Sequence, residues 1–168
     1  MSQVLAIGPV MNYTWIDWWG WPLDTNILAY AEGIGDETRC LSARKLVKKL
    51  TDSEVILPAQ TLGELSRVLV AKDKRNNSRV RETVLEWADS FLVADSTWFA
   101  FQTALDLTGD HQIPIWDALI LSVAAEHHCR LLLSEDFQNG FTWQGVKVIN
   151  PFATSRSSLL NDLFLTSG

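Results

Sequence analysis

The chain has 168 residues, of which 47% are hydrophobic and 20% are charged, and its formal net charge is −6. This length suits one domain that folds without disulfide or metal support, and the composition excludes a disordered, collagen-like or coiled-coil chain. An acidic chain does not bind nucleic acid through its overall charge. Such binding would require a local basic patch, a bound cation or a basic partner.

The two cysteines, Cys40 and Cys129, are too few for a disulfide framework, so we expect an intracellular, cytoplasmic protein. The His and Cys residues lack the paired spacing of a zinc site, and a metal ion would therefore be bound by oxygen. Residues 1–22 form a leader with four of the eight tryptophans and part of a first strand. Its apolar run is too short to span a bilayer, and no Lys or Arg precedes it as in a secretory signal.

From Leu23 onward, short apolar runs alternate with segments of helical periodicity. After a first strand that ends before Asp24 and a helix that follows it, the pattern predicts helix 41–50, strand 55–57, helix 61–72, a helix capped by Ser78, strand 91–93, helices 98–107 and 116–126, and strands 131–133 and 146–149. Continuous apolar strands are typical of parallel sheets covered on both faces. We therefore predict a single α/β domain over residues 23–152, with a mostly parallel sheet flanked by helices, and a C-terminal tail over 153–168.

Four acidic residues fall near the carboxyl ends of predicted strands, where open α/β sheets bind their ligands: Asp24, Glu64, Asp117 and Asp136. Taken singly, each has a structural explanation as a helix cap, a first-turn acid or a turn residue, and Thr61 with Glu64 has the spacing of a capping box. Taken together, they would converge. Two unit charges about 5 Å apart repel by roughly 3 kcal/mol at an effective dielectric constant of ~20, so a cluster favours a divalent cation such as Mg²⁺ or Mn²⁺.

Several short segments, in this order, resemble the PIN-domain family and its VapC-type toxin branch: Leu23-Asp24-Thr25-Asn26-Ile27-Leu28, Glu64-Leu65, Trp116-Asp117-Ala118-Leu119-Ile120, Leu133-Ser134-Glu135-Asp136 and Gly145-Val146-Lys147-Val148-Ile149-Asn150-Pro151-Phe152. The resemblance implies a small metal-dependent endoribonuclease, the toxin of a type II toxin–antitoxin pair. It also implies a homodimer that is held inactive by a cognate antitoxin, with RNA as substrate and no membrane partner. One feature departs from the family: Gly20 and Pro22 interrupt the strand before Asp24, so that strand is either short and distorted or paired differently.

The family's acidic residues carry over to Asp24, Glu64, Asp117 and Asp136, which we expect to be both catalytic residues and ligands of Mg²⁺ or Mn²⁺. Thr25, Asn26 and Ser134 would orient these carboxylates or water. Glu135 is a second choice for the place of Asp136. A basic segment either binds RNA phosphates or is a solvated connection between helices. Trp116 either stacks on a base or packs in the core. The basic segment consists of Lys72, Lys74, Arg75, Arg79 and Arg81.

Two other enzyme classes fit less well, because Asn26 stands where a haloacid-dehalogenase phosphatase needs its second Asp and where an aspartic protease needs Gly. The alternative outside enzymes is a PIN-like binding module that has lost its activity. None of the four carboxylates is missing, which favours the enzyme.

Overall fold

A computed structural model of the chain describes residues 20–50, 55–154, 158, 160 and 161. The predicted α/β fold is confirmed, with element bounds shifted by a few residues, and a short strand, β5, was not predicted. The elements are β1 (Trp21–Pro22), α1 (Thr25–Ala31), α2 (Glu37–Lys49), β2 (Val55–Pro58), α3 (Ala59–Asp73), α4 (Asn77–Ser90), β3 (Leu92–Ala94), α5 (Trp98–His111), α6 (Ile115–Glu126), β4 (Leu131–Leu133), β5 (Thr142–Trp143) and β6 (Val146–Ile149).

The sheet is built from two groups of strands. β1, β2 and β3 pair in parallel, whereas β6 pairs in parallel with β4 and antiparallel with β5. A bridge between Leu23 and Leu133 joins the groups, which gives the order β3-β2-β1-β4-β6-β5. The chain winds in one direction from β1 and in the other from β4, so the ends of these two strands mark a switch point, where open α/β sheets bind ligands.

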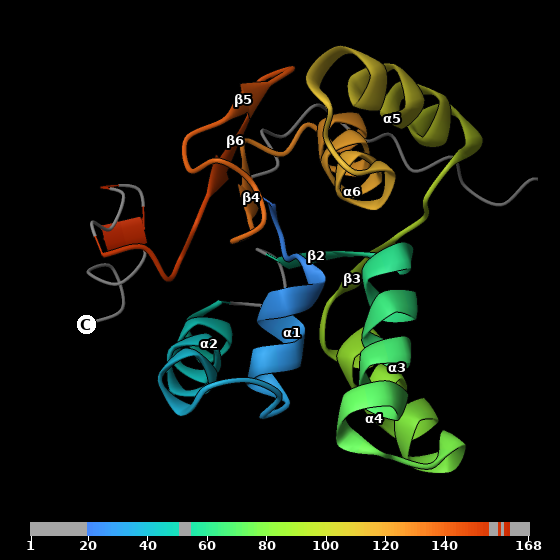
Figure 1. Ribbon diagram of the computed structural model, residues 1–168, viewed down its shortest axis with the longest axis vertical. Helices are drawn as coiled ribbons and strands as arrows, with labels where there is room; N and C mark the ends of the chain where they lie inside the picture. Colours follow the sequence, from blue (N-terminus) through green and yellow to red (C-terminus); the bar gives the residue numbers. More distant parts are fainter. Residues whose placement is uncertain (1–19, 51–54, 155–157, 159, 162–168) are drawn as a thin grey trace, which may run out of the picture.

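Helices cover both faces of the sheet, with α5 and α6 on one face and α1 to α4 on the other (Figure 1). Alternate residues of one strand therefore enter different cores: Val55 and Leu57 of β2 pack toward α1–α4, and Ile56 packs toward α5–α6. Leu132 in the middle of β4 likewise joins the α5–α6 core. Burial on both faces explains the uninterrupted apolar strands, because burying each such side chain contributes about 1.5–3 kcal/mol.

Pro22 leaves β1 with two residues, so the strand is short, which is one of the two outcomes expected from the sequence. The backbone beyond Pro22 still pairs on both sides. The Leu23 N–H donates to the Ile56 carbonyl at 3.3 Å, and the Asp24 N–H donates to the Leu133 carbonyl at 3.0 Å. These two bonds fix Asp24 between β2 and β4, at the switch point.

Two helix starts differ from the prediction. Helix α3 begins at Ala59, immediately after β2, so Thr61 and Glu64 do not form a capping box. The Thr61 hydroxyl lies 3.5 Å from the Leu23 carbonyl, to which it donates. Helix α4 is capped by Asn76, whose side-chain oxygen accepts from the Arg79 N–H, and Ser78 lies within the helix. In both places the connection before the helix is shorter than the sequence pattern indicated.

Glu32, which ends α1, anchors the α3–α4 hairpin. Its carboxylate accepts hydrogen bonds from Arg75 at 2.8 Å and from the Trp87 indole at 2.9 Å. Arg75 also donates to Asp73 and to the Thr83 hydroxyl. The Arg75 side chain is 18% exposed, so this predicted RNA-binding residue is committed to bonds within the protein.

Part of the C-terminal tail packs on the domain, because Leu160 is buried in the α1–α4 core. The Trp-rich leader lies outside the described residues, except for Gly20, Trp21 and Pro22. Among the described helices, none has the length and apolar character needed to cross a membrane.

The Arg75 cluster gives a first prediction. We expect Arg75→Ala to lower the free energy of unfolding by about 2 kcal/mol, because it leaves the Glu32 carboxylate without its charged partner. Urea denaturation followed by circular dichroism measures this change. Arg79→Ala is the matched control: Arg79 is 65% exposed, its ion pair with Glu82 is on the surface, and its removal should cost less than about 0.5 kcal/mol. Equal effects of the two substitutions would contradict the structural role of Arg75.

Candidate active site

Three of the predicted carboxylates meet at the switch point. Asp24 follows β1 and caps α1, Asp117 lies in the first turn of α6, and Asp136 follows β4. One carboxylate oxygen from each lies within 4.8 Å of the others. The three elements are far apart in the sequence, and the sheet pairing between β1 and β4 brings them together.

Asp24 is almost completely buried, at 2% exposure. One of its oxygens accepts from the Thr25 N–H at 2.6 Å and the other accepts from the Ser134 hydroxyl. Burial, together with the charges of Asp136 and Asp117, raises the pKa of Asp24 from 3.8 to about 7, although the two hydrogen bonds act in the opposite direction. Without a cation, this carboxylate is therefore only partly ionised near neutral pH.

The two other aspartates also hold their protons more tightly than usual. Burial, followed by the charges of Asp136 and Glu64, raises the pKa of Asp117 to about 6. The pKa of Asp136 is raised by burial and by Glu135, against a lowering effect of its hydrogen bond from Asn26. Burial is thus the main cause of the raised pKa values, and repulsion between neighbouring carboxylates adds to it.

Glu64 of α3 lies beside this group but outside it. Its charge contributes to the raised pKa of Asp117, and its carboxylate accepts from the Thr25 hydroxyl at 2.8 Å. The structure therefore places Glu64 at the same cavity as the aspartates but not among the oxygens within 4.8 Å of one another.

Each of the predicted supporting residues contacts at least one of the four carboxylates. Thr25 donates to Glu64, Ser134 donates to Asp24, and the Asn26 amide donates to Asp136 at 3.0 Å. The Ser134 oxygen also accepts from the Asp136 N–H at 3.1 Å. These bonds restrict the positions of the carboxylates, as the polar neighbours of metal ligands do.

The donor set fits a hard divalent cation. All the ligand atoms are oxygens, and the carboxylates are strained by mutual repulsion that a cation would relieve. In addition, the side-chain oxygen of Asn26 is buried without a hydrogen-bond partner among the described residues, so an oxygen beside the cluster is unsatisfied. Mg²⁺ and Mn²⁺ are the ions that this chemistry suits.

Glu135 is turned away from the cluster. Its carboxylate accepts from the Tyr30 hydroxyl and from the Arg39 guanidinium, the latter at 3.0 Å. Arg39 also lies over the Tyr30 ring, 5.9 Å from its centroid. Glu135 is thus held by α1 and α2, while its neighbour Asp136 joins the other aspartates. The Tyr30 and Arg39 contacts were not predicted, because no local sequence signal links three such distant residues.

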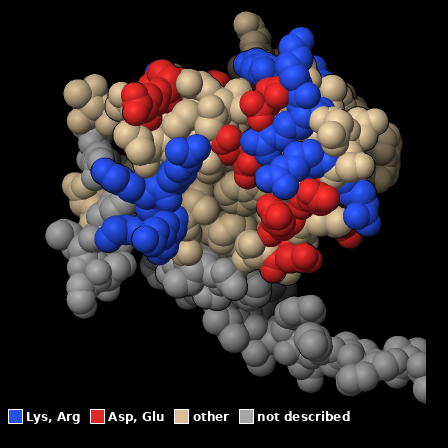
Figure 2. Space-filling model, turned by 90° about the horizontal axis from the view of Figure 1, so that it is seen from below, with Lys and Arg blue, Asp and Glu red and all other residues tan. Residues whose placement is uncertain are grey.

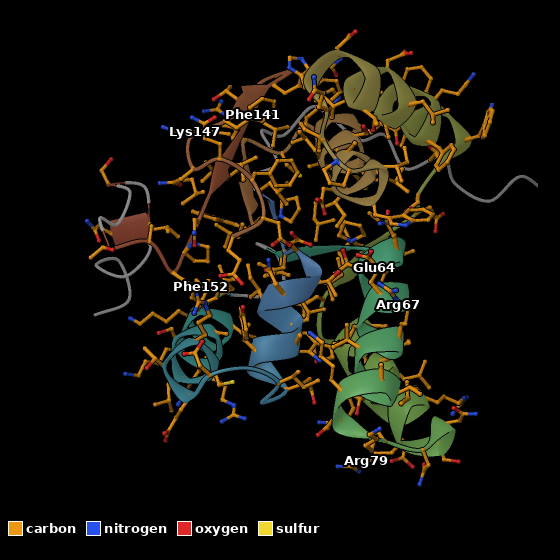
Figure 3. All side chains as sticks on the ribbon, viewed as in Figure 1. Glu64, Arg67, Arg79, Phe141, Lys147 and Phe152 are labelled. Carbon is orange, nitrogen blue, oxygen red and sulfur yellow. The ribbon has the colours of Figure 1, made fainter. Side chains whose placement is uncertain are left out.

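A cavity of about 470 Å³ opens over the carboxylates, and Arg67 and Lys72 of α3 also line it. Of the predicted basic segment, only Lys72 lines this cavity. Arg81 lines a separate hollow between α3 and α4, and Lys74 ends α3 in a left-handed conformation. Figure 3 shows Arg79 at the opposite end of the hairpin from Glu64. Arg67 was missed as a site residue, although its position three residues after Glu64 places both on one helix face.

The distribution of surface charge agrees with this separation of the basic residues into those that line the cavity and those that do not. Figure 2 shows the Lys and Arg residues in separate groups, one over α2 and one over the α3–α4 hairpin, where Asp and Glu side chains are interspersed. The α2 group includes the exposed residues Arg44, Lys45 and Lys48. The hairpin is therefore a mixed-charge surface, and the cations best placed to act on a ligand of the carboxylates are Arg67 and Lys72.

The raised pKa of Asp24 gives a pH prediction for the metal-free protein. The native state binds this proton more tightly than the unfolded chain, so its contribution to stability is greatest below about pH 4 and decreases as the pH rises to about 7. In Asp24→Asn we expect a weaker decrease in the free energy of unfolding over this range. Urea denaturation in EDTA at several pH values measures it. Asp106→Asn, on the exposed face of α5, is the control, and a wild-type slope in Asp24→Asn would contradict the prediction.

Solved structures with the same fold come from several bacteria. Mycobacterium tuberculosis VapC20, described as a sarcin-ricin loop cleaving toxin, matches with a TM-score of 0.57 and 18% identity over 67% of this chain and 87% of that chain. A toxin–antitoxin complex from Klebsiella pneumoniae matches with a TM-score of 0.59 and 18% identity over 79% and 98%. FitAcB from Neisseria gonorrhoeae matches with a TM-score of 0.56 and 20% identity over 79% and 98%.

No curated protein matches the sequence. The family model described as PIN domain matches residues 23–139. This range contains the three clustered aspartates, Glu64 and the supporting residues Thr25, Asn26 and Ser134. The sequence match and the fold agree, and the chain belongs to the PIN-domain family.

Proposed function

We propose that this protein is a Mg²⁺- or Mn²⁺-dependent endoribonuclease and the toxin of a type II toxin–antitoxin pair. The observation that carries the proposal is the convergence of Asp24, Asp117 and Asp136, whose carboxylate oxygens lie within 4.8 Å at the switch point of the sheet. Repulsion among the three aspartates destabilises the fold unless a cation binds them, and replacing any one of them by Asn would relieve it.

Asp24, Asp117 and Asp136 would hold the cation, with Glu64 at the edge of the same cavity. When bound, a divalent cation supplies an activated water at neutral pH and neutralises charge that develops on a phosphate. The chain itself positions the reaction: Ser134 and the Thr25 N–H fix Asp24, and Asn26 fixes Asp136. Such fixed geometry removes the cost of reorganising the carboxylates during the reaction.

Arg67 and Lys72 would bind the phosphates of the RNA on either side of the cleaved bond. Both line the cavity that contains the carboxylates. Phosphate contacts of this kind provide most of the affinity of sequence-independent RNA binding, and they position the chain for reaction. An acidic protein can thus bind RNA through a small local set of cations.

The toxin part of the proposal draws on the solved structures, which include toxin–antitoxin complexes of the same fold. We propose a cognate antitoxin with a basic segment, because the cavity is lined by five acidic side chains and two basic ones. We further propose a cytoplasmic homodimer. Large apolar side chains that remain exposed on α5, including Trp98 and Phe99, support self-association.

The alternative function is a PIN-like binding module without activity. It would keep RNA or antitoxin binding but would not cut RNA in the presence of Mg²⁺ or Mn²⁺. All four predicted carboxylates are present and the supporting residues contact three of them, Asp24, Glu64 and Asp136, which favours the enzyme.

Removing one carboxylate tests the enzyme proposal. In Asp117→Asn we expect Mn²⁺-dependent cleavage of mixed RNA to fall at least about a hundredfold, with the fold retained, because the substitution removes a ligand and relieves repulsion. Gel analysis of RNA fragments measures activity, and circular dichroism checks the fold. Asp106→Asn should keep wild-type activity. Full activity of Asp117→Asn, or cleavage by the wild type in excess EDTA, would refute the metal-dependent mechanism.

The salt dependence of RNA binding tests the role of the cavity cations. We expect the double substitution Arg67→Ala and Lys72→Ala to weaken RNA binding and to reduce the slope of log K against log salt by about 1.4, since each phosphate contact on single strands contributes about 0.7. Fluorescence anisotropy with a labelled oligonucleotide measures both quantities. Arg79→Ala is the control, because Arg79 lies at the far end of the hairpin (Figure 3). An unchanged slope in the double variant would contradict the assignment.

A further inference from the structure

A second cavity adjoins the carboxylates. Its volume is about 390 Å³, and it is lined by Gln60, Gly63, Glu64, Arg67 and Trp116. Glu64 and Arg67 line both cavities, so the two spaces meet along one side of α3. The second cavity lies within the size range of small-ligand sites, about 300–1,000 Å³.

Trp116 presents a large aromatic surface next to this cavity. It is 51% exposed, so of the two possibilities left open by the sequence, packing in the core is wrong. Its ring contacts Phe101, with centroids 6.5 Å apart, and Phe101 stacks on Trp98 at 5.8 Å. These aromatic neighbours support the indole from one side, and the exposed part remains available to a flat ligand. Asp117 follows directly, so a ligand on Trp116 lies beside the metal-binding residues.

Gln60 adds an unsatisfied acceptor to the same cavity. Its amide nitrogen donates to the Trp116 backbone carbonyl at 3.1 Å, which fixes the start of α3 against the start of α6. Its side-chain oxygen is buried and has no hydrogen-bond partner in the described part of the chain. A buried acceptor without a donor is unfavourable, and a ligand that carries an N–H group would satisfy it.

Gly63 keeps the cavity open. It lies inside α3, where glycine is less favourable than alanine or leucine. A Cβ atom added at Gly63 would meet no atom within 4 Å among the described residues, so close packing does not require the glycine there. What the glycine does provide is space, because it lines both this cavity and the hollow between α3 and α4, and a side chain at this position would occupy part of that open space.

We infer that this cavity is a nucleobase subsite for the RNA substrate. One base adjacent to the cleaved phosphate stacks on Trp116, and an N–H group of that base donates to the Gln60 oxygen. Arg67, which is shared by both cavities, binds the phosphate that connects this base to the carboxylates. The subsite therefore requires a stacked base that presents an N–H donor, which an abasic position lacks. The inference rests on the proposed function, since it assigns the RNA contacts of the same site.

An abasic scan tests the subsite without requiring cleavage. Full-length Asp117→Asn protein is titrated with labelled single-stranded RNA oligonucleotides, each with one abasic position, and anisotropy gives the dissociation constants. At one position, loss of the base should weaken binding about tenfold. Adding Trp116→Ala should weaken binding of the intact RNA by a similar factor, and removing the base at that position should then have no further effect on affinity. Trp116→Phe should retain most of the affinity. Gln60→Ala should weaken binding of the intact RNA and leave binding of the oligonucleotide that is abasic at that position unchanged.

Filling the cavity is the second arm of the test. Gly63→Leu should maintain or raise the thermal stability of α3 and should weaken RNA binding about tenfold. The matched control is Gly109→Leu, which makes the same change on α5, at another position where an added Cβ meets no atom within 4 Å. Gly109 lines none of the cavities described above, so its substitution should leave RNA binding unchanged.

Three results would overturn the inference: equal abasic penalties with and without Trp116, unchanged RNA binding in Gly63→Leu, or a fall in the sedimentation mass of Trp116→Ala. The last result would show that Trp116 serves an interface between copies of the chain. The ribonuclease proposal is judged separately, by Mn²⁺-dependent cleavage with the wild type. If the wild type cuts no RNA but the abasic penalty depends on Trp116, the nuclease proposal fails and the base subsite stands.

Discussion

Like charges held together at the switch point of the sheet set the main constraint on this protein. Asp24, Asp117 and Asp136 repel one another, at a cost of roughly 3 kcal/mol for each ionised pair about 5 Å apart. The backbone keeps Asp24 in place, because Leu23 pairs with β2 and Asp24 pairs with β4. The two cores on opposite faces of the sheet supply the stability that tolerates this arrangement.

Hydrogen bonds then give neighbouring residues different roles. Ser134, Glu135 and Asp136 are consecutive, yet Ser134 contacts Asp24, Glu135 contacts Tyr30 and Arg39, and Asp136 contacts Asn26. The contacts with Tyr30 and Arg39 keep the Glu135 carboxylate out of the closest group, although its charge still raises the pKa of Asp136. A site of three aspartates with Glu64 beside it is thus a result of how several elements share the available donors.

The positive charges are divided in a similar way. Arg75 stabilises the fold by binding Glu32, whereas Arg67 and Lys72 line the cavity over the carboxylates. The cavity on the other side of Glu64 adds Trp116 and Gln60 to the surroundings of the site. Charge and aromatic surface therefore meet along α3 and the start of α6.

The sequence by itself determined the alternation of strands and helices, since continuous apolar runs identify strands covered on both faces. It also determined that acidic residues follow strand ends, which was enough to anticipate that Asp24, Asp117 and Asp136 gather at one edge of the sheet. Only the tertiary structure decided that Glu64 lies outside the closest group, that Glu135 binds Arg39, that Arg75 is structural and that Trp116 is exposed. These outcomes depend on contacts between residues far apart in the chain, which local patterns of charge and hydrophobicity do not encode.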